Sequence, residues 1–106
     1  MQAQQAICQE CGAGFERRRA DVLFCCADHR QAFHKRMANR GQLLTPFVMG
    51  WRLGKQGKSE TSTWAMRQMA TLADKWNAED KAAGRPPMSQ LLETRMAMCW
   101  SASDLG

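Results

Sequence analysis

The sequence predicts a small α+β protein in which a metal-stabilised finger (a knuckle, a β-hairpin and a helix) is followed by an α-helical hairpin. Side chains that can bind metal recur at Cys8, Cys11, Cys25 and His29. Apolar residues recur at helical spacing in the second half of the chain, and Gly84 followed by Pro86-Pro87 interrupts them. The 106 residues, 44% of them hydrophobic, suffice for one small domain with an appendage. We therefore expect a zinc finger over 1–41, a short helix and a basic linker over 42–58, and a helical hairpin over 59–106.

The first 24 residues are expected to form the knuckle and a hairpin. Residues 1–6 are polar and should fray. Gly12, directly after Cys11, permits a tight turn that points backbone amides at sulfur. Phe15 and the apolar run 22–24 flank three consecutive arginines, which predicts a short β-hairpin with an arginine tip.

Residues 26–40 predict a helix that ends at Gly41. Asp28 suits the positive end of the helix dipole, and the basic residues near position 40 suit its negative end. Phe33 and Met37 are four residues apart and should face one side.

Thr45 and Pro46 predict a second helix start, with proline at the first helical position. A short helix would then run from about Pro46 to Leu53. The alternative is one helix from Gln42 onward, kinked at Pro46. Residues 55–59 have the composition of a flexible basic linker.

Two further helices are expected over about 62–83 and 88–101. The first carries an apolar stripe at helical spacing, formed by Ala65, Met69, Leu72, Ala73 and Trp76. The second carries Leu91, Leu92, Met96, Cys99 and Trp100. These stripes could be buried against each other in an αα-hairpin or across a homodimer.

Zinc is the metal that the spacing predicts. The pattern is Cys-x2-Cys-x13-Cys-x3-His, and three sulfurs with one imidazole complete a closed, structural, four-ligand site for one Zn²⁺ ion. Cys25 and His29 share a helical face, as would Cys26 and His29, so either cysteine could be the third ligand; His34 could replace His29. Metal would supply folding energy that about thirty residues cannot obtain by packing.

The segment 7–41 resembles treble-clef zinc fingers of the FCS type, including those of small bacterial and prophage proteins with a helical tail. The resemblance is carried by the first cysteine pair with Gly12 and Phe15, the arginine run, and Phe24-Cys25-x3-His29-Arg30. Cys26 stands where serine is usual in that family, and His29 where its last cysteine is usual. The family includes nucleic-acid binders and protein adapters, and a related bacterial group inhibits DNA gyrase by protein contact. The resemblance thus implies a zinc-held fold and leaves both kinds of partner open.

Charge favours nucleic acid over protein as the partner. Net charge is +5, and residues 1–41 and 42–58 each contribute +3 whereas residues 59–106 contribute −1. The expected phosphate-binding residues of the finger are Arg17, Arg18, Arg19, Arg30, Lys35, Arg36 and Arg40. The chain would then act as a bacterial or phage regulatory or accessory factor. The alternative is a protein adapter or inhibitor, with the finger as scaffold and the helices as contact surface.

We expect no enzymatic activity, since the two histidines offer no triad and there is no glycine-rich phosphate loop. The first residues lack the pattern of a signal peptide, and no apolar run is long enough to cross a membrane. Five cysteines without such a signal favour metal binding in the cytoplasm over disulfides.

Overall fold

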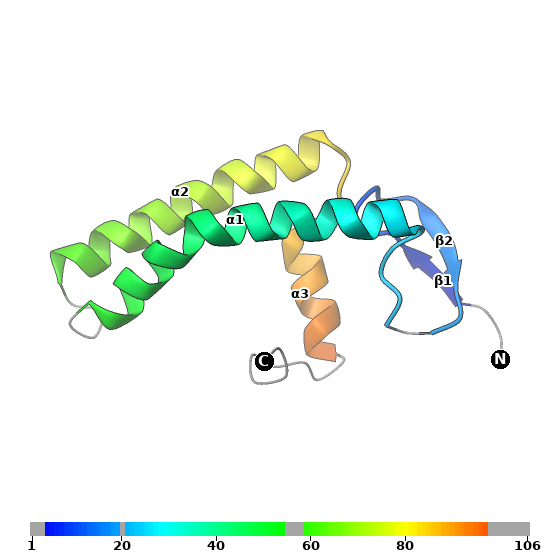
Figure 1. Ribbon diagram of the computed structural model, residues 1–106, viewed down its shortest axis with the longest axis horizontal. Helices are drawn as coiled ribbons and strands as arrows, with labels where there is room; N and C mark the ends of the chain where they lie inside the picture. The colour runs from blue at the N-terminus through cyan, green and yellow to red at the C-terminus, as the bar shows by residue number, and fades with distance from the viewer. Residues whose placement is uncertain (1–3, 20, 55–58, 98–106) are drawn as a thin grey trace.

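The computed structural model of the chain describes residues 4–19, 21–54 and 59–97. It contains a two-stranded sheet and three helices in the order β1 (Gln4–Ile7), β2 (Gly14–Arg17), α1 (Ala27–Leu53), α2 (Glu60–Ala82) and α3 (Met88–Ala97). Figure 1 shows α1 and α2 side by side as a long antiparallel pair, with the strands at the N-terminal end of α1. The chain is elongated, with extents of 53 × 30 × 19 Å. The small α+β class is confirmed.

The hairpin lies earlier in the chain than predicted. β1 and β2 are antiparallel, and Ala6 pairs with Phe15. The cysteine knuckle, the turn that carries Cys8 and Cys11, is the connection between the two strands. Of residues 1–6, which were expected to fray, residues 4–6 belong to β1 and residues 1–3 lie outside the described residues. The arginine run begins at the last residue of β2 and continues into a loop, because the knuckle has already reversed the chain.

A single helix, α1, replaces the two predicted helices, so the stop at Gly41 and the separate start at Pro46 are wrong. Contacts with α2 continue beyond Pro46, because Phe47 packs on Trp64 with ring centroids 5.6 Å apart and the Ser62 hydroxyl donates to the Trp51 carbonyl at 2.8 Å. This packing offsets the proline's missing hydrogen bond, and α1 bends in its C-terminal part instead of breaking (Figure 1). The linker 55–58 lies outside the described residues.

The partner of α2 is α1, and the predicted pairing of α2 with α3 as an αα-hairpin is wrong. The predicted helix over 62–83 is confirmed within two residues as α2, and Ser59 caps it by accepting a hydrogen bond from the Ser62 amide at 3.1 Å. α3 diverges from the long pair (Figure 1). Cys99 and Trp100 lie outside the described residues. None of the described helices is both long enough and apolar enough to span a bilayer.

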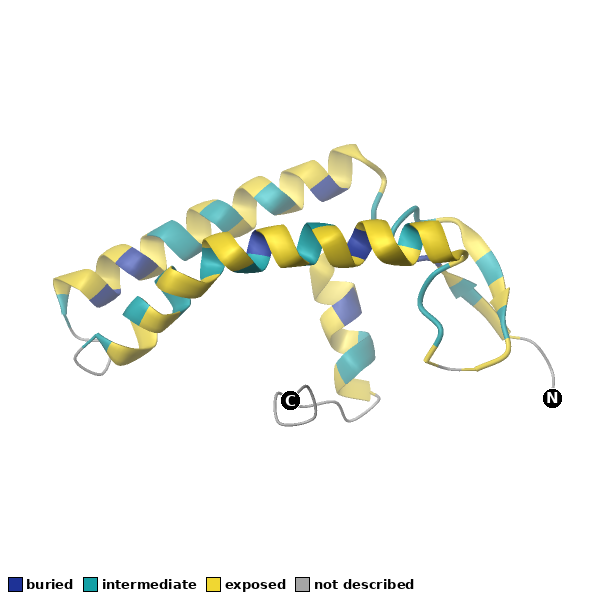
Figure 2. Ribbon diagram, viewed as in Figure 1, coloured by how far each residue is buried: buried dark blue, intermediate teal, exposed yellow. Residues whose placement is uncertain are grey.

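Few apolar side chains are buried. Among the described residues the buried hydrophobic ones are Cys8, Phe33, Ala65 and Leu91, and Figure 2 shows buried positions only sparsely along the helices. Of the predicted α2 stripe, Ala65 is buried, Met69, Leu72 and Trp76 are half-buried, and Ala73 is exposed. Polar contacts therefore contribute much of the specificity of the packing.

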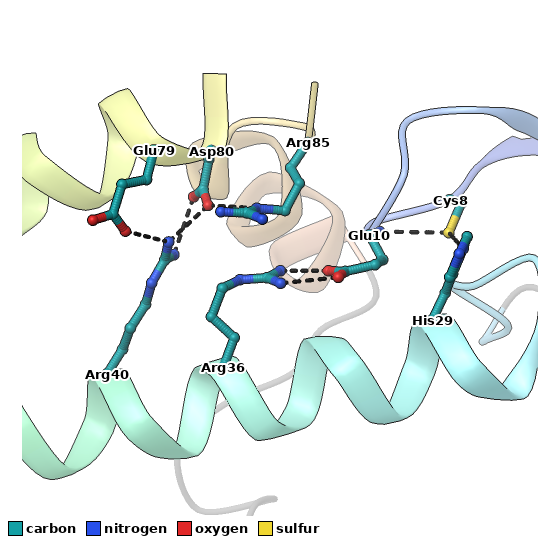
Figure 3. Close-up of polar contacts among 8 residues, drawn as sticks. All are labelled: Cys8, Glu10, His29, Arg36, Arg40, Glu79, Asp80 and Arg85. Atoms are coloured by element: carbon teal, nitrogen blue, oxygen red, sulfur yellow. Dashed lines mark hydrogen bonds and ion pairs between the residues drawn. The ribbon is translucent and has the colours of Figure 1, made fainter. Parts of the chain in front are cut away.

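Ion pairs link α1 to α2 and to the loop that follows α2. The Arg40 guanidinium donates two hydrogen bonds to the Asp80 carboxylate, at 2.8 and 3.1 Å, and Asp80 accepts a third from Arg85 at 2.9 Å (Figure 3). Asp80 is 4% exposed and Arg40 is 9% exposed. Burial would raise the pKa of the Asp80 carboxyl, but the hydrogen bonds and charges of Arg40 and Arg85 hold it below its ordinary value of 3.8.

The loop after α2 also touches the knuckle. Gly12 has φ +77°, and a Cβ placed on it would lie 2.6 Å from the carbonyl oxygen of Gly84. Gly84 itself has φ +74°, but a Cβ there would meet nothing within 4 Å. Glycine at position 12 is thus required for both its conformation and this close backbone approach.

Asp80→Asn should lower the free energy of unfolding by about 3 kcal/mol, because buried Arg40 would keep only the longer contact with half-exposed Glu79, at 3.7 Å, to balance its charge. Since the pKa of Asp80 is lowered in the folded protein, its contribution is complete above pH 3.8 and is lost as the pH falls through the folded-state value. Urea unfolding of both proteins should therefore give a constant difference above that pH and a shrinking one below it. Asp74→Asn on the exposed surface of α2 is the control and should change stability by less than about 0.5 kcal/mol.

Gly12→Ala should destabilise the protein more than Gly84→Ala does. Both substitutions place a side chain at positive φ, which costs about 1 kcal/mol. Only Gly12→Ala also forces the knuckle away from the Gly84 carbonyl. Equal losses in thermal unfolding would show that the knuckle and the loop do not touch in solution.

Candidate metal centre and the groove beside it

The knuckle is a tight turn that aims amides and sulfur inward. The amide of Cys8 donates to the Ala13 carbonyl and that of Gly12 to the Cys8 carbonyl, each at 2.9 Å. The Glu10 amide donates to the Cys8 sulfur at 3.4 Å. This places Cys8 and Cys11 on one side of the turn, with Cys8 wholly buried.

The second pair of candidate ligands comes from the start of α1. Cys25 precedes the helix and His29 lies in its first turns, so both side chains reach the knuckle. The Gln9 amide donates to the Leu23 carbonyl at 2.9 Å, which holds the loop before α1 against the knuckle. Figure 3 shows His29 pointing from α1 toward Cys8.

The four side chains converge on one point. The donor atoms of Cys8, Cys11, Cys25 and His29 all lie within 4.8 Å of one another. The Cys11 and Cys25 sulfurs are 3.9 Å apart, and the Cys8 sulfur is 3.8 Å from Nδ1 of His29. Metal–sulfur bonds of about 2.3 Å at tetrahedral angles require donors roughly 3.8 Å apart. The cluster therefore fits a single metal ion.

The thiol pKa values show why this cluster suits a cation. Burial opposes ionisation of Cys8, but hydrogen bonds from the backbone of Cys25, Cys11 and Glu10 and from His29 lower its pKa to about 6. Desolvation and the neighbouring sulfurs of Cys8, Cys11 and Cys26 raise the pKa of Cys25 to about 12. One thiolate therefore disfavours a second, and a bound dication would remove that repulsion.

The structure discriminates between the candidate ligands that the sequence left open. Both cysteines are exposed and their sulfurs are 4.0 Å apart, but only Cys25 has its sulfur within 4.8 Å of all the other donor atoms of the cluster. His34 lies against Phe24 and Phe33, with ring centroids 5.8 and 5.7 Å away, and is not part of the cluster. The expected set of four is thus the one that the fold brings together.

The predicted basic residues divide into internal and exposed groups. Arg36 pairs with Glu10 of the knuckle through two hydrogen bonds, and Arg40 pairs with Asp80 (Figure 3). Arg17 is half-buried and donates to the Val22 carbonyl at 3.3 Å. The exposed members are Arg18, Arg19, Arg30 and Lys35. The guanidinium groups of Arg36 and Arg40 therefore join parts of the fold instead of facing a partner.

One face of α1 has a sequence pattern that the prediction from charge alone did not recognise. His29, Phe33, Arg36 and Arg40 follow one another at spacings of four, three and four, which places them on one helical face. That face carries a metal ligand, a buried ring and two paired arginines. Glu10 and Asp80, which the sequence did not single out, supply the opposite charges.

A groove of about 530 Å³ runs beside the metal cluster, between the loop after β2, the start of α1, and α3. Its basic lining comes from Arg19, Arg30 and Arg95, one from each of these parts. Arg19 also pairs with exposed Asp21 at 3.3 Å. Phe24, Cys26 and His34 complete the wall next to the helix.

Comparison with protein-family models, with curated proteins and with solved structures found no significant match. The family resemblance of residues 7–41 therefore stays a prediction.

Removal of any cluster ligand should abolish metal binding and unfold the finger. Co²⁺ titration of Cys11→Ser or Cys25→Ser should give no tetrahedral thiolate spectrum and a loss of structure, because a three-donor site leaves the knuckle and α1 unlinked. Cys26→Ser is the matched control and should bind about one ion per chain, as the unmodified protein does. A full spectrum from Cys25→Ser together with none from Cys26→Ser would contradict the assignment.

Proposed function

We propose that this chain is a non-enzymatic zinc-binding module that binds nucleic acid through the groove beside its metal centre. Three thiolates and one imidazole are the donor set that Zn²⁺ prefers, and four protein ligands leave no position for a reacting water. The metal would accordingly be structural. It would hold the knuckle and the start of α1 together and so shape the groove.

The observation that carries this proposal is the basic lining of the groove. Arg19, Arg30 and Arg95 belong to three different elements, yet they line one depression. A guanidinium fork matches phosphate oxygens, and the N-terminal end of α1 adds its positive dipole. Exposed Arg18 and Lys35 extend the positive charge around the finger. Asp21 is the acidic residue among the groove's lining residues.

Both histidines of the proposed module have structural surroundings. His29 belongs to the metal cluster, and His34 packs on two phenylalanine rings instead of a nucleophile or a carboxylate. The module would therefore act by binding to nucleic acid without changing it chemically, as a regulatory or accessory factor does.

A protein adapter is the second candidate, and an apolar cavity of about 310 Å³ favours it. The cavity lies where α1, α2 and the start of α3 meet, and its apolar lining includes Met37, Leu44, Trp76 and Met88. A protein bound there would be held by apolar contact, so its affinity would change little with salt and would not depend on Arg30.

Nucleic-acid affinity should fall steeply with salt, because phosphate contacts release counterions. Fluorescence anisotropy with mixed-sequence DNA and RNA should show a decrease of at least tenfold between about 50 and 200 mM salt. Arg30→Ala should weaken binding. It should also reduce the slope of log affinity against log salt concentration by about one, because one phosphate contact is lost. Arg52→Ala is the control, because this residue lies about 33 Å along the same helix from Arg30.

Salt-independent affinity, or no binding to either nucleic acid, would overturn the proposed function. A salt-insensitive protein complex that survives Arg30→Ala would instead identify the adapter role.

A further inference from the structure

We infer that the groove takes a single strand, with a base stacked on the ring of His34, Phe24 in contact with the edge of that base, and the adjacent phosphates held by arginine. This inference rests on the proposed function and specifies its ligand as single-stranded nucleic acid. Phe24 and His34 form an aromatic wall on one side of the groove. Phosphate binding alone would not need this wall.

The buried ring of Phe33 supports the aromatic wall. Phe33 is 3% exposed, and its ring lies 5.0 Å from that of Phe24 and 5.7 Å from that of His34, the latter at an interplanar angle of 85°. The ring centroids of Phe24 and His34 are 5.8 Å apart and the rings are inclined by 64°, so a base that stacks on the imidazole meets Phe24 at its edge. Contact with two neighbouring rings restricts the exposed imidazole, so little conformational entropy remains to be lost when a base stacks on it.

The arginines and the aromatic rings are close enough to serve one nucleotide. Arg30 and His34 are four residues apart on α1, which places their side chains on the same face about one helical turn apart. Both line the groove, and Arg19 and Arg95 line it from the loop and from α3. A strand along this groove would present its phosphates to the arginines and one base to the rings.

A duplex cannot use this wall in the same way. Its bases are stacked inside the helix and expose only their edges, so a protein aromatic ring has no free base face to cover. In a single strand the bases are free, and aromatic stacking combined with a positive groove is the usual mode of recognition. The groove volume of about 530 Å³ also lies within the roughly 300–1,000 Å³ of pockets that enclose small ligands.

Binding of two matched probes to the metal-loaded full chain tests the inference. One probe is a short fluorescein-labelled oligothymidine, and the other is the same strand annealed to its complement. The single strand should bind more tightly. His34→Ala should weaken its binding about fivefold or more, the loss of one stacked base, and should leave duplex affinity unchanged.

Three further variants separate stacking from charge and from folding. His34→Phe should restore single-strand affinity, because a phenyl ring stacks without carrying a charge. Arg30→Ala should weaken both probes. Asn39→Ala, at another exposed position on α1, should change neither affinity, and all four variants should keep the metal content and melting temperature of the parent.

Equal affinity for the two probes, or a His34→Ala variant that binds the single strand normally while Arg30→Ala does not, would overturn the stacking inference and leave the proposed function standing. Failure of both probes to bind the unmodified protein would overturn both.

Discussion

Convergence of four donor atoms at one point is the constraint on which the rest of this structure depends. Cys8 and Cys11 come from a turn between two short strands, and Cys25 and His29 come from the start of a helix. The buried hydrophobic side chains of those segments are Cys8 and Phe33, so a metal bound by the four donors would supply much of the free energy that holds the turn against the helix. The direction in which α1 leaves the finger follows from that link.

Ion pairs extend this link along α1. Arg36 connects the helix to Glu10 of the knuckle, and Arg40 connects it to Asp80 of α2, where Arg85 also binds (Figure 3). These contacts are directional, and a buried charge that loses its oppositely charged partner is strongly destabilising. A chain with four buried hydrophobic residues in its described part thereby obtains a defined helix arrangement. The groove is formed by the loop after β2, the start of α1 and Arg95 of α3.

Only part of the positive charge on α1 is exposed to a possible partner. Arg36 and Arg40 stand in the same stretch as Arg30 and Lys35, and all four carry the same charge. The helix turns the first two toward the protein and the others outward. What remains outside is a compact basic groove with an aromatic wall, a more specific surface than an extended basic face.

The sequence alone determined the position of a candidate four-donor metal site that begins at Cys8 and Cys11, the presence of a turn at Gly12, and the extent of α2, because spacing along the chain encodes each of them locally. It left Cys25 and Cys26 as alternatives, since both lie within one helical turn of His29. Only the tertiary structure decided that α1 continues through Gly41 and Pro46, that its partner is α2, and that Glu10 and Asp80 take up two of the arginines. Those outcomes depend on contacts between residues as far apart as Arg40 and Asp80. Local propensity cannot report such contacts, because their free energy exceeds the cost of a proline within a helix only after the two segments have met.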